Sequence, residues 1–116
     1  MCDVHWFTTI GRSHGLNDRN GGVQLIREIW VAQSGKCALT GTALVKGETA
    51  SLDHIVPTSK GGTSSRENLR WVRLDVNGAK RAMNDAELVA MCRAVVEHHD
   101  REGACVLSIV KENRNG

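Results

Sequence analysis

Hydrophobic positions recur at helical spacing in two stretches of the chain. The first stretch is followed by Gly35, a typical helix stop, so we predict a helix over residues 22–34. Before the second stretch, Asn84 and Glu87 form a capping box, which predicts a helix that runs to about residue 99. The apolar positions of this second helix that we expect to face the core are Leu88, Met91, Cys92, Val95 and Val96.

Between these helices the pattern changes to short runs that are typical of strands. Residues 50–56 fit a strand that Pro57 ends, and residues 69–74 fit a second one because branched and aromatic side chains dominate there. The residues between them, 58–67, are rich in Ser, Thr and Gly and are predicted as a loop. Residues 75–83 are expected to form a short helix.

Two further segments show weaker patterns. Residues 37–44 fit a tight turn between two short extended pieces, with Gly41 available for a positive φ. The apolar run at residues 105–110 is compatible with a last strand. Together with the predicted helices, these segments indicate an α+β fold.

Length and composition indicate one small domain, because 116 residues with 41% hydrophobic content bury a single core. We assign residues 21–100 to this domain, and the strand, loop, strand and short helix at about residues 50–83 form its centre. Residues 1–20 show no sustained period and are expected to form an N-terminal arm or irregular cover. Residues 101–116 are assigned to a C-terminal extension.

The chain lacks the signals of a membrane or secreted protein. It has no run of about eighteen or more apolar residues, and its start lacks the basic and then apolar segments of a signal peptide. We therefore expect a cytoplasmic protein with no membrane partner.

The cysteines predict no structural zinc site. Because they are widely spaced and form no CxxC pair, we expect reduced and mostly buried thiols. A structural zinc-knuckle domain is the disfavoured alternative, which stoichiometric bound zinc would support. The four residues are Cys2, Cys37, Cys92 and Cys105.

Positive charge is concentrated in one segment, although the net charge is only +2. Residues 59–83 carry six basic and two acidic side chains, whereas the charges of residues 1–58 cancel and residues 84–116 are net negative. This segment fits contact with a phosphate backbone, and a solvated basic face is the alternative. The basic residues that we predict as DNA contacts are Lys60, Arg66, Arg70, Arg73, Lys80 and Arg81.

The same part of the chain carries candidate chemistry. Asp53 and His54 lie at the end of the first predicted strand, and Asn68 and Asn77 follow. The imidazole of His54, with an unperturbed pKa of about 6.5, can accept a proton from water at physiological pH. Adjacent side chains of a strand point to opposite faces, so we assign Asp53 to a metal ion and His54 to water.

These residues resemble the motif of the HNH endonuclease family. The matching elements are DHI at 53–55, Pro57, the Gly pair at 61–62, NL at 68–69 and Asn-x-x-Lys at 77–80, preceded by GKCALTG at 35–41. The continuation from residue 77 to residue 95 is similar to compact members from phages and mobile elements. The resemblance covers residues 25–100 and implies a ββα-metal (His-Me finger) core with flanking helices.

The resemblance also implies roles for single residues. Asp53 and Asn77 would bind one divalent ion, His54 would act as general base, and Asn68 would hold the 58–67 loop, and with it His54, through backbone hydrogen bonds. Carboxylate and amide oxygens suit Mg²⁺ or Mn²⁺. In this family the ion stabilises the 3′ leaving oxygen, and the products are a 5′-phosphate and a 3′-hydroxyl.

Two departures from the family pattern affect these expectations. Many members carry CxxC pairs around the core, whereas Cys37 stands alone here, so no structural zinc is expected. Asn77 replaces the last His of the family name, which makes the chain an H-N-N variant and favours a hard metal ion.

The predicted function is a metal-dependent endonuclease that nicks or cuts double-stranded DNA. One active site cuts one strand, so a double-strand break would need a homodimer or a partner protein of a phage or its host. If the protein is phage-encoded, we expect it in the cytoplasm of the host cell. The alternative is a catalytically degenerate ββα module that binds DNA without cutting it.

Overall fold

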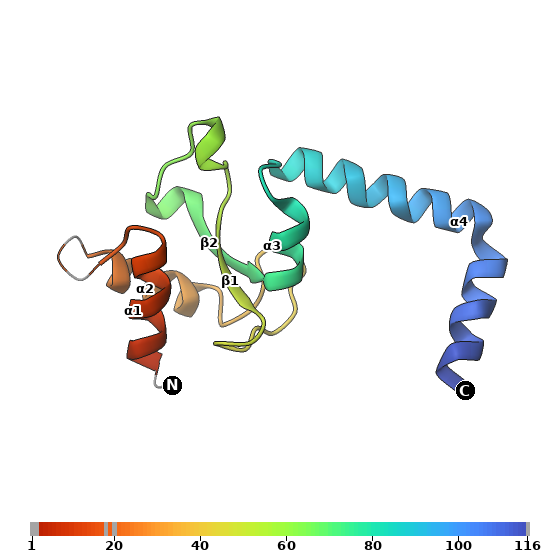
Figure 1. Ribbon diagram of the computed structural model, residues 1–116, viewed down its shortest axis with the longest axis horizontal. Coiled ribbons are helices and arrows are strands. Elements are labelled where there is room, and N and C mark those ends of the chain that lie inside the picture. The colour runs from red at the N-terminus through yellow and green to blue at the C-terminus, as the bar shows by residue number, and fades with distance from the viewer. Residues whose placement is uncertain (1–2, 18, 20, 116) are drawn as a thin grey trace. The chain divides into compact units, whose positions relative to one another are not determined.

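The structure is a computed structural model that describes residues 3–17, 19 and 21–115. The chain divides into two compact units, one that ends at Asn84 and one that begins at Asp85, and each is described by itself. The first unit is a small α+β fold (Figure 1). Its helices and strands are α1 (Asp3–Ser13), α2 (Gly22–Ala32), β1 (Ala50–His54), β2 (Leu69–Arg73) and α3 (Leu74–Lys80), with single 3₁₀ turns at Thr58–Lys60 and Arg66–Asn68.

The predicted strands pair with each other and the predicted short helix follows them. β1 and β2 form an antiparallel sheet whose register runs from Ala50 opposite Arg73 to His54 opposite Leu69. Helix α3 begins directly after β2 and packs against both strands. In Figure 1, α1 and α2 lie next to each other on the side of the strands away from α3. Both predicted strands and the helices predicted at residues 22–34 and 75–83 are therefore confirmed, as β1, β2, α2 and α3.

The core of this unit is centred on Trp71 of β2, whose side chain is fully buried. Its Nε1 donates a hydrogen bond to the carbonyl oxygen of Ile26 in α2 at 2.9 Å, so the indole N–H is satisfied inside the core. Trp6 of α1 stacks on Trp71 with ring centroids 4.9 Å apart. These contacts fasten both N-terminal helices to the sheet.

The prediction of an arm or irregular cover for residues 1–20 was wrong for residues 3–13, whereas residues 14–17 and 19 belong to no helix or strand. Residues 3–13 form α1, and its Trp6 and Phe7 are buried in the core. The segment was misread because only a few apolar side chains stand among Gly, Ser and charged residues. Their partners lie in α2 and β2, far along the sequence, and burial against them outweighs the weak local pattern.

The predicted tight turn after α2 is confirmed. Lys36 and Ala43 form an isolated antiparallel bridge, and Gly41 has a φ of 75°. The backbone N–H of Ala38 donates to the carbonyl oxygen of Trp71 at 3.0 Å. The turn is thereby tied to β2.

The second unit consists of α4 (Asp85–Asn115), and it corrects two predictions. The helix begins as predicted but continues through residues 105–110, which were expected to form a strand. Short apolar runs do not separate strand from helix by pattern alone. Met91, Cys92, Val95 and Val96 are exposed rather than directed into a core, whereas Leu88 is buried.

None of the helices in the described part of the chain is long and apolar enough to cross a membrane.

Candidate functional site

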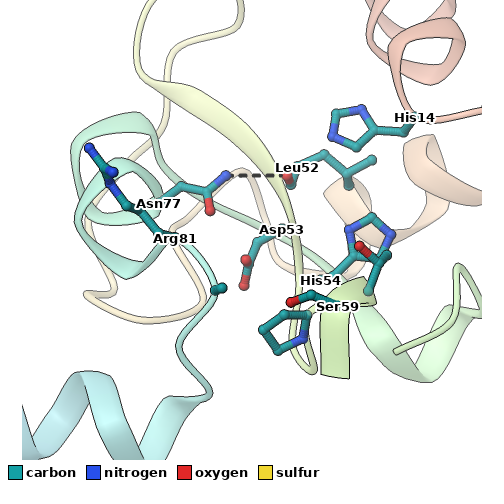
Figure 2. Close-up of a pocket in the computed structure, with 10 residues that line it drawn as sticks. His14, Leu52, Asp53, His54, Ser59, Asn77 and Arg81 are labelled. Atoms are coloured by element: carbon teal, nitrogen blue, oxygen red, sulfur yellow. Dashed lines mark hydrogen bonds between the residues drawn. The ribbon is translucent and has the colours of Figure 1, made fainter. Parts of the chain in front are cut away.

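An open cleft of about 280 Å³ is lined by the end of β1, the loop after it and the end of α3. Asp53, His54 and Asn77, which were predicted as site residues, all line it. Figure 2 shows the Asp53 carboxylate on the α3 side of β1 and the His54 ring on the other side. The two side chains therefore divide as the alternation of a strand requires.

Asp53 is almost completely buried, with 4% of its surface exposed, and two cationic groups hold its carboxylate. Lys80 Nζ lies 3.0 Å from Oδ1 and 3.2 Å from Oδ2, and Arg70 Nε donates to Oδ2 at 2.9 Å. A buried carboxylate needs such partners because desolvation strongly disfavours an isolated charge. Its position in the lining of the cleft is thus fixed by Lys80 of α3 and Arg70 of β2.

Asn77 is oriented by hydrogen bonds from its amide nitrogen. Nδ2 donates to Ser51 Oγ at 2.7 Å and to the Leu52 carbonyl oxygen at 3.3 Å. The assignment of N and O follows from these acceptors, since a carbonyl oxygen can only accept. Oδ1 is thereby left toward the cleft, and Figure 2 shows it turned to the side of the Asp53 carboxylate.

His54 ends β1 and is held between the following loop and the N-terminal part of the chain. Its Nε2 lies 3.1 Å from Ser64 Oγ, and its ring lies near His14, with centroids 6.0 Å apart. Burial and the neighbouring His14 and Lys80 lower the pKa of His54 below its usual value of 6.5, while Asp53 opposes them. These surroundings favour the neutral imidazole, which is the form that accepts a proton.

Asn68 closes the loop that follows β1. Its Nδ2 donates to the carbonyl oxygens of Val56 and Thr63 at 3.0 and 2.7 Å, and its Oδ1 accepts from the Val56 N–H at 2.8 Å. These are backbone hydrogen bonds across the loop, as expected from the sequence, whereas a contribution to catalysis stays a prediction. Gly62 of the same loop lies so close to the backbone of Val56 that an added Cβ would be 1.8 Å from the Val56 carbonyl oxygen.

The predicted DNA contacts separate into two groups. Lys80 is completely buried, so it is not available at the surface to a phosphate, whereas Arg70 is 12% exposed and paired with Asp53. The expectation for Lys80 is corrected because it neutralises the buried carboxylate, and contact of Arg70 with DNA stays a prediction. Arg81 lines the cleft, where its backbone has a φ of 47°.

The remaining basic residues lie away from the lining of the cleft. Arg73 pairs with Asp75 at 2.6 Å and Arg66 with Glu28 at 3.0 Å, both at the surface. Lys60 is exposed in the loop after β1. Their contact with DNA remains a prediction.

Sequence reasoning missed two residues of this site. His14 comes from the turn after α1, outside the segment that carries the motif, and it lines the cleft. Ser64 contacts His54 from within a run of similar loop residues. Neither carried a signal in the sequence, because only folding brings them to His54.

The oxygen atoms of Asp53 and Asn77 fit a hard divalent ion such as Mg²⁺ or Mn²⁺. A carboxylate has about four acceptor positions, and three hydrogen bonds leave one of them on Asp53 Oδ1. No group of three or more His, Cys, Asp and Glu side chains gathers among the described residues. An ion here would therefore depend on one carboxylate, one amide, water and a substrate phosphate.

No protein-family model matches the chain, and a search of curated proteins finds no match either. The HNH resemblance therefore rests on the motif residues and on the cleft that they line.

Proposed function

We propose that the chain is a metal-dependent endonuclease of the HNH type, which hydrolyses phosphodiester bonds of double-stranded DNA. The observation that carries this proposal is the convergence of Asp53, His54 and Asn77 on one open polar cleft. The order of β1, β2 and α3 supports a ββα-metal core as the scaffold. Single family residues are common in unrelated proteins, but three of them in one cleft form a set with complementary chemistry.

In the proposed mechanism, His54 takes the proton of a water molecule whose oxygen attacks the phosphorus. If Ser64 Oγ accepts a hydrogen bond from Nε2, Nδ1 is the ring nitrogen with the free lone pair. Asn68 keeps the loop closed and so holds the backbone that follows His54. The bond from phosphorus to the 3′ oxygen breaks, and that oxygen takes a proton from solvent.

Asp53 and Asn77 would hold one Mg²⁺ or Mn²⁺ ion at the phosphate. When bound, the ion supplies positive charge where the phosphoryl and leaving oxygens become more negative. Asp53 is kept in place for this role by Lys80 and Arg70. Arg81 at the edge of the cleft and Lys60 in the loop are the nearest candidates for contacts with neighbouring phosphates.

A second candidate function is a ββα module that binds DNA without cutting it. The ion pairs of Asp53 favour this reading, because two protein cations already neutralise the carboxylate that would bind the metal. Their positive charge also lowers the affinity of the site for a divalent ion. The two functions differ in whether any divalent ion supports cleavage.

Plasmid cleavage tests the proposal. Supercoiled plasmid incubated with the protein and Mg²⁺ or Mn²⁺ should be relaxed or linearised. His54→Ala should lower the rate by a factor of about 10²–10⁴, which is the usual loss for a general base. His5→Ala is the matched control, because His5 is an exposed histidine on α1.

Circular dichroism must show that both variants are folded. Equal rates for wild type and His54→Ala would remove the assignment of the general base. Salt-sensitive DNA binding without cleavage under any divalent ion would favour the second candidate instead.

A further inference from the structure

His14 reaches the cleft from outside the segment that carries the motif. It follows α1, lines the same cleft as Asp53 and Asn77, and lies next to the ring of His54. Figure 2 shows the two imidazoles close together at one side of the cleft. The proposed mechanism gives His14 no role, although its ring lines the cleft that the proposal assigns to DNA.

The ring of His14 is held in a defined orientation. Its Nδ1 lies 3.0 Å from the carbonyl oxygen of Ile10 and 3.1 Å from Ser13 Oγ. Because a carbonyl oxygen only accepts, Nδ1 carries the hydrogen of that bond. Nε2 is therefore the ring nitrogen that remains for a ligand.

The backbone that carries this ring is also fixed. Before His14 in the sequence, Trp6 and Phe7 of α1 are buried in the core. After it, Leu16 is buried as well. The N–H groups of His14 and Leu16 both donate to the Gly11 carbonyl oxygen, at 3.0 and 2.7 Å. His14 is thus anchored on both sides, as a residue with a positional role would be.

A structural explanation accounts for only part of this arrangement. Histidine near a helix C-terminus often hydrogen-bonds a terminal carbonyl group, which explains the contact of Nδ1 with Ile10. It does not explain why the ring lies over His54 in the cleft. His5, on the same helix, is exposed.

We propose that His14 contacts the substrate, with its Nε2–H donating to a phosphate oxygen of the DNA strand in the cleft. With Nδ1–H bound to Ile10, a hydrogen on Nε2 makes the ring a cation, and a charge-assisted hydrogen bond from such a donor to an anionic phosphate is stronger than a neutral one. The other charged or titratable groups that line the cleft are Asp53, His54 and Arg81. This inference rests on the proposed function, because it takes DNA as the ligand of the cleft.

A measurement of DNA binding without cleavage tests the phosphate contact of His14 separately from the proposed nuclease activity. In a His54→Ala background and with a chelator present, the affinity for a labelled duplex is measured by fluorescence anisotropy over a series of salt concentrations at one pH. Adding His14→Ala should weaken binding about tenfold, the usual effect of one charged hydrogen bond. It should also reduce the slope of log K against log salt by about 0.9, which corresponds to one phosphate contact.

Two further variants control this measurement. His5→Ala in the same background should leave both affinity and slope unchanged, because His5 is exposed on α1. His14→Gln retains an N–H donor without the charge, so it should recover part of the affinity but not the salt slope. With His54 present and Mg²⁺ or Mn²⁺ added, His14→Ala should also slow plasmid cleavage relative to His5→Ala.

The outcomes are distinct. If His14→Ala binds DNA like His5→Ala, the inference is overturned, and a lower melting temperature with unchanged affinity would assign His14 a structural role. If wild type does not cleave but His14→Ala still loses affinity and salt slope, the nuclease proposal fails while the phosphate contact stands.

Discussion

A buried ammonium group is stable at Lys80 because oxygen atoms surround it. Nζ contacts both carboxylate oxygens of Asp53 and the carbonyl oxygens of His54 and Ile55, at 2.7 to 3.2 Å. The side chain has no exposed surface. Lys80 thus neutralises Asp53 and also ties α3 to the end of β1.

Replacing Lys80 by Met should lower the free energy of unfolding by about 3–5 kcal/mol, because it removes one partner of a buried ion pair. Urea titration followed by circular dichroism measures this change. Lys36→Met is the matched control, since Lys36 is exposed, and it should change stability by less than about 0.5 kcal/mol. Equal effects of the two substitutions would contradict the structural importance of the pair.

The lowered pKa of His54 gives a second prediction at the scale of the residue. Because the folded-state pKa lies below the unfolded value of about 6.5, the unfolded chain takes up a proton first as the pH falls. His54 should therefore reduce stability as the pH drops from above 6.5 through its folded-state pKa. Proton NMR titration of the metal-free protein should place the pKa of His54 below 6.5.

His14→Ala should raise the pKa of His54, because His14 is the largest cause of the lowering after burial. His5→Ala should leave it unchanged. A pKa of His54 at or above 6.5 in the wild type would contradict the described surroundings of the ring.

Among the elements, the loop between β1 and β2 requires a glycine, whereas α3 does not. A Cβ at Gly62 would lie 1.8 Å from the Val56 carbonyl oxygen, but a Cβ at Gly78 in α3 would meet nothing within 4 Å. Gly62→Ala should therefore destabilise the protein by about 2 kcal/mol or more, because backbone atoms would have to move. Gly78→Ala should stabilise it by about 1 kcal/mol, the difference in helix propensity.

Thermal unfolding of the two glycine variants measures both effects. A Gly62→Ala variant as stable as wild type would show that the loop can relax away from Asn68. In that case, the rigid support inferred for His54 would be wrong.

The sequence predicted the elements that have strong local patterns. α2 was recognised from its hydrophobic spacing, β1 from its apolar run and Pro57, and β2 from its branched and aromatic side chains, and the described bounds of these elements and of α3 differ from the predictions by a few residues. Helix α1 was missed because Trp6 and Phe7 are recognisable as core residues only from their contacts with Trp71, which lies far along the sequence. The strand expected at residues 105–110 was wrong because an apolar run suits either structure.

The candidate site was predicted where its residues lie close together in the sequence and was missed where only long-range packing brings them together. Asp53, His54 and Asn77 belong to one short motif, and all three line the cleft. The roles of Lys80 and Arg70 could not be read from charge alone, since the burial of Asp53 decides that they pair with it. His14 lies forty positions before His54, and only the packing of α1 brings the two together.

At the scale of the whole molecule, the cleft and the core belong to the first unit. All members of its hydrophobic cluster lie between residues 6 and 72, and all residues that line the cleft lie between 14 and 82. Residues 1–84 carry eleven basic and seven acidic side chains, a net charge of +4, whereas the remaining residues carry −2. The first unit therefore carries the net positive charge that would favour binding to DNA.

A fragment of residues 1–84 should fold and bind DNA at least as tightly as the full chain. Its core cluster is complete, and its net charge is more positive. Cooperative thermal unfolding and anisotropy with a labelled duplex test the two parts of this prediction. Loss of the cooperative transition would mean that α4 contributes to the stability of the first unit.

The ion pair between Lys80 and Asp53 has a practical consequence. In small metal-dependent folds, a chelator removes the ion and the structure with it. Here the carboxylate keeps two protein cations as counter-charges, so we expect the fold to withstand a chelator. If the chain is the proposed nuclease, one batch of protein can be stripped with a chelator and assayed with each divalent metal in turn, and differences in reaction rate should then report on the metal alone.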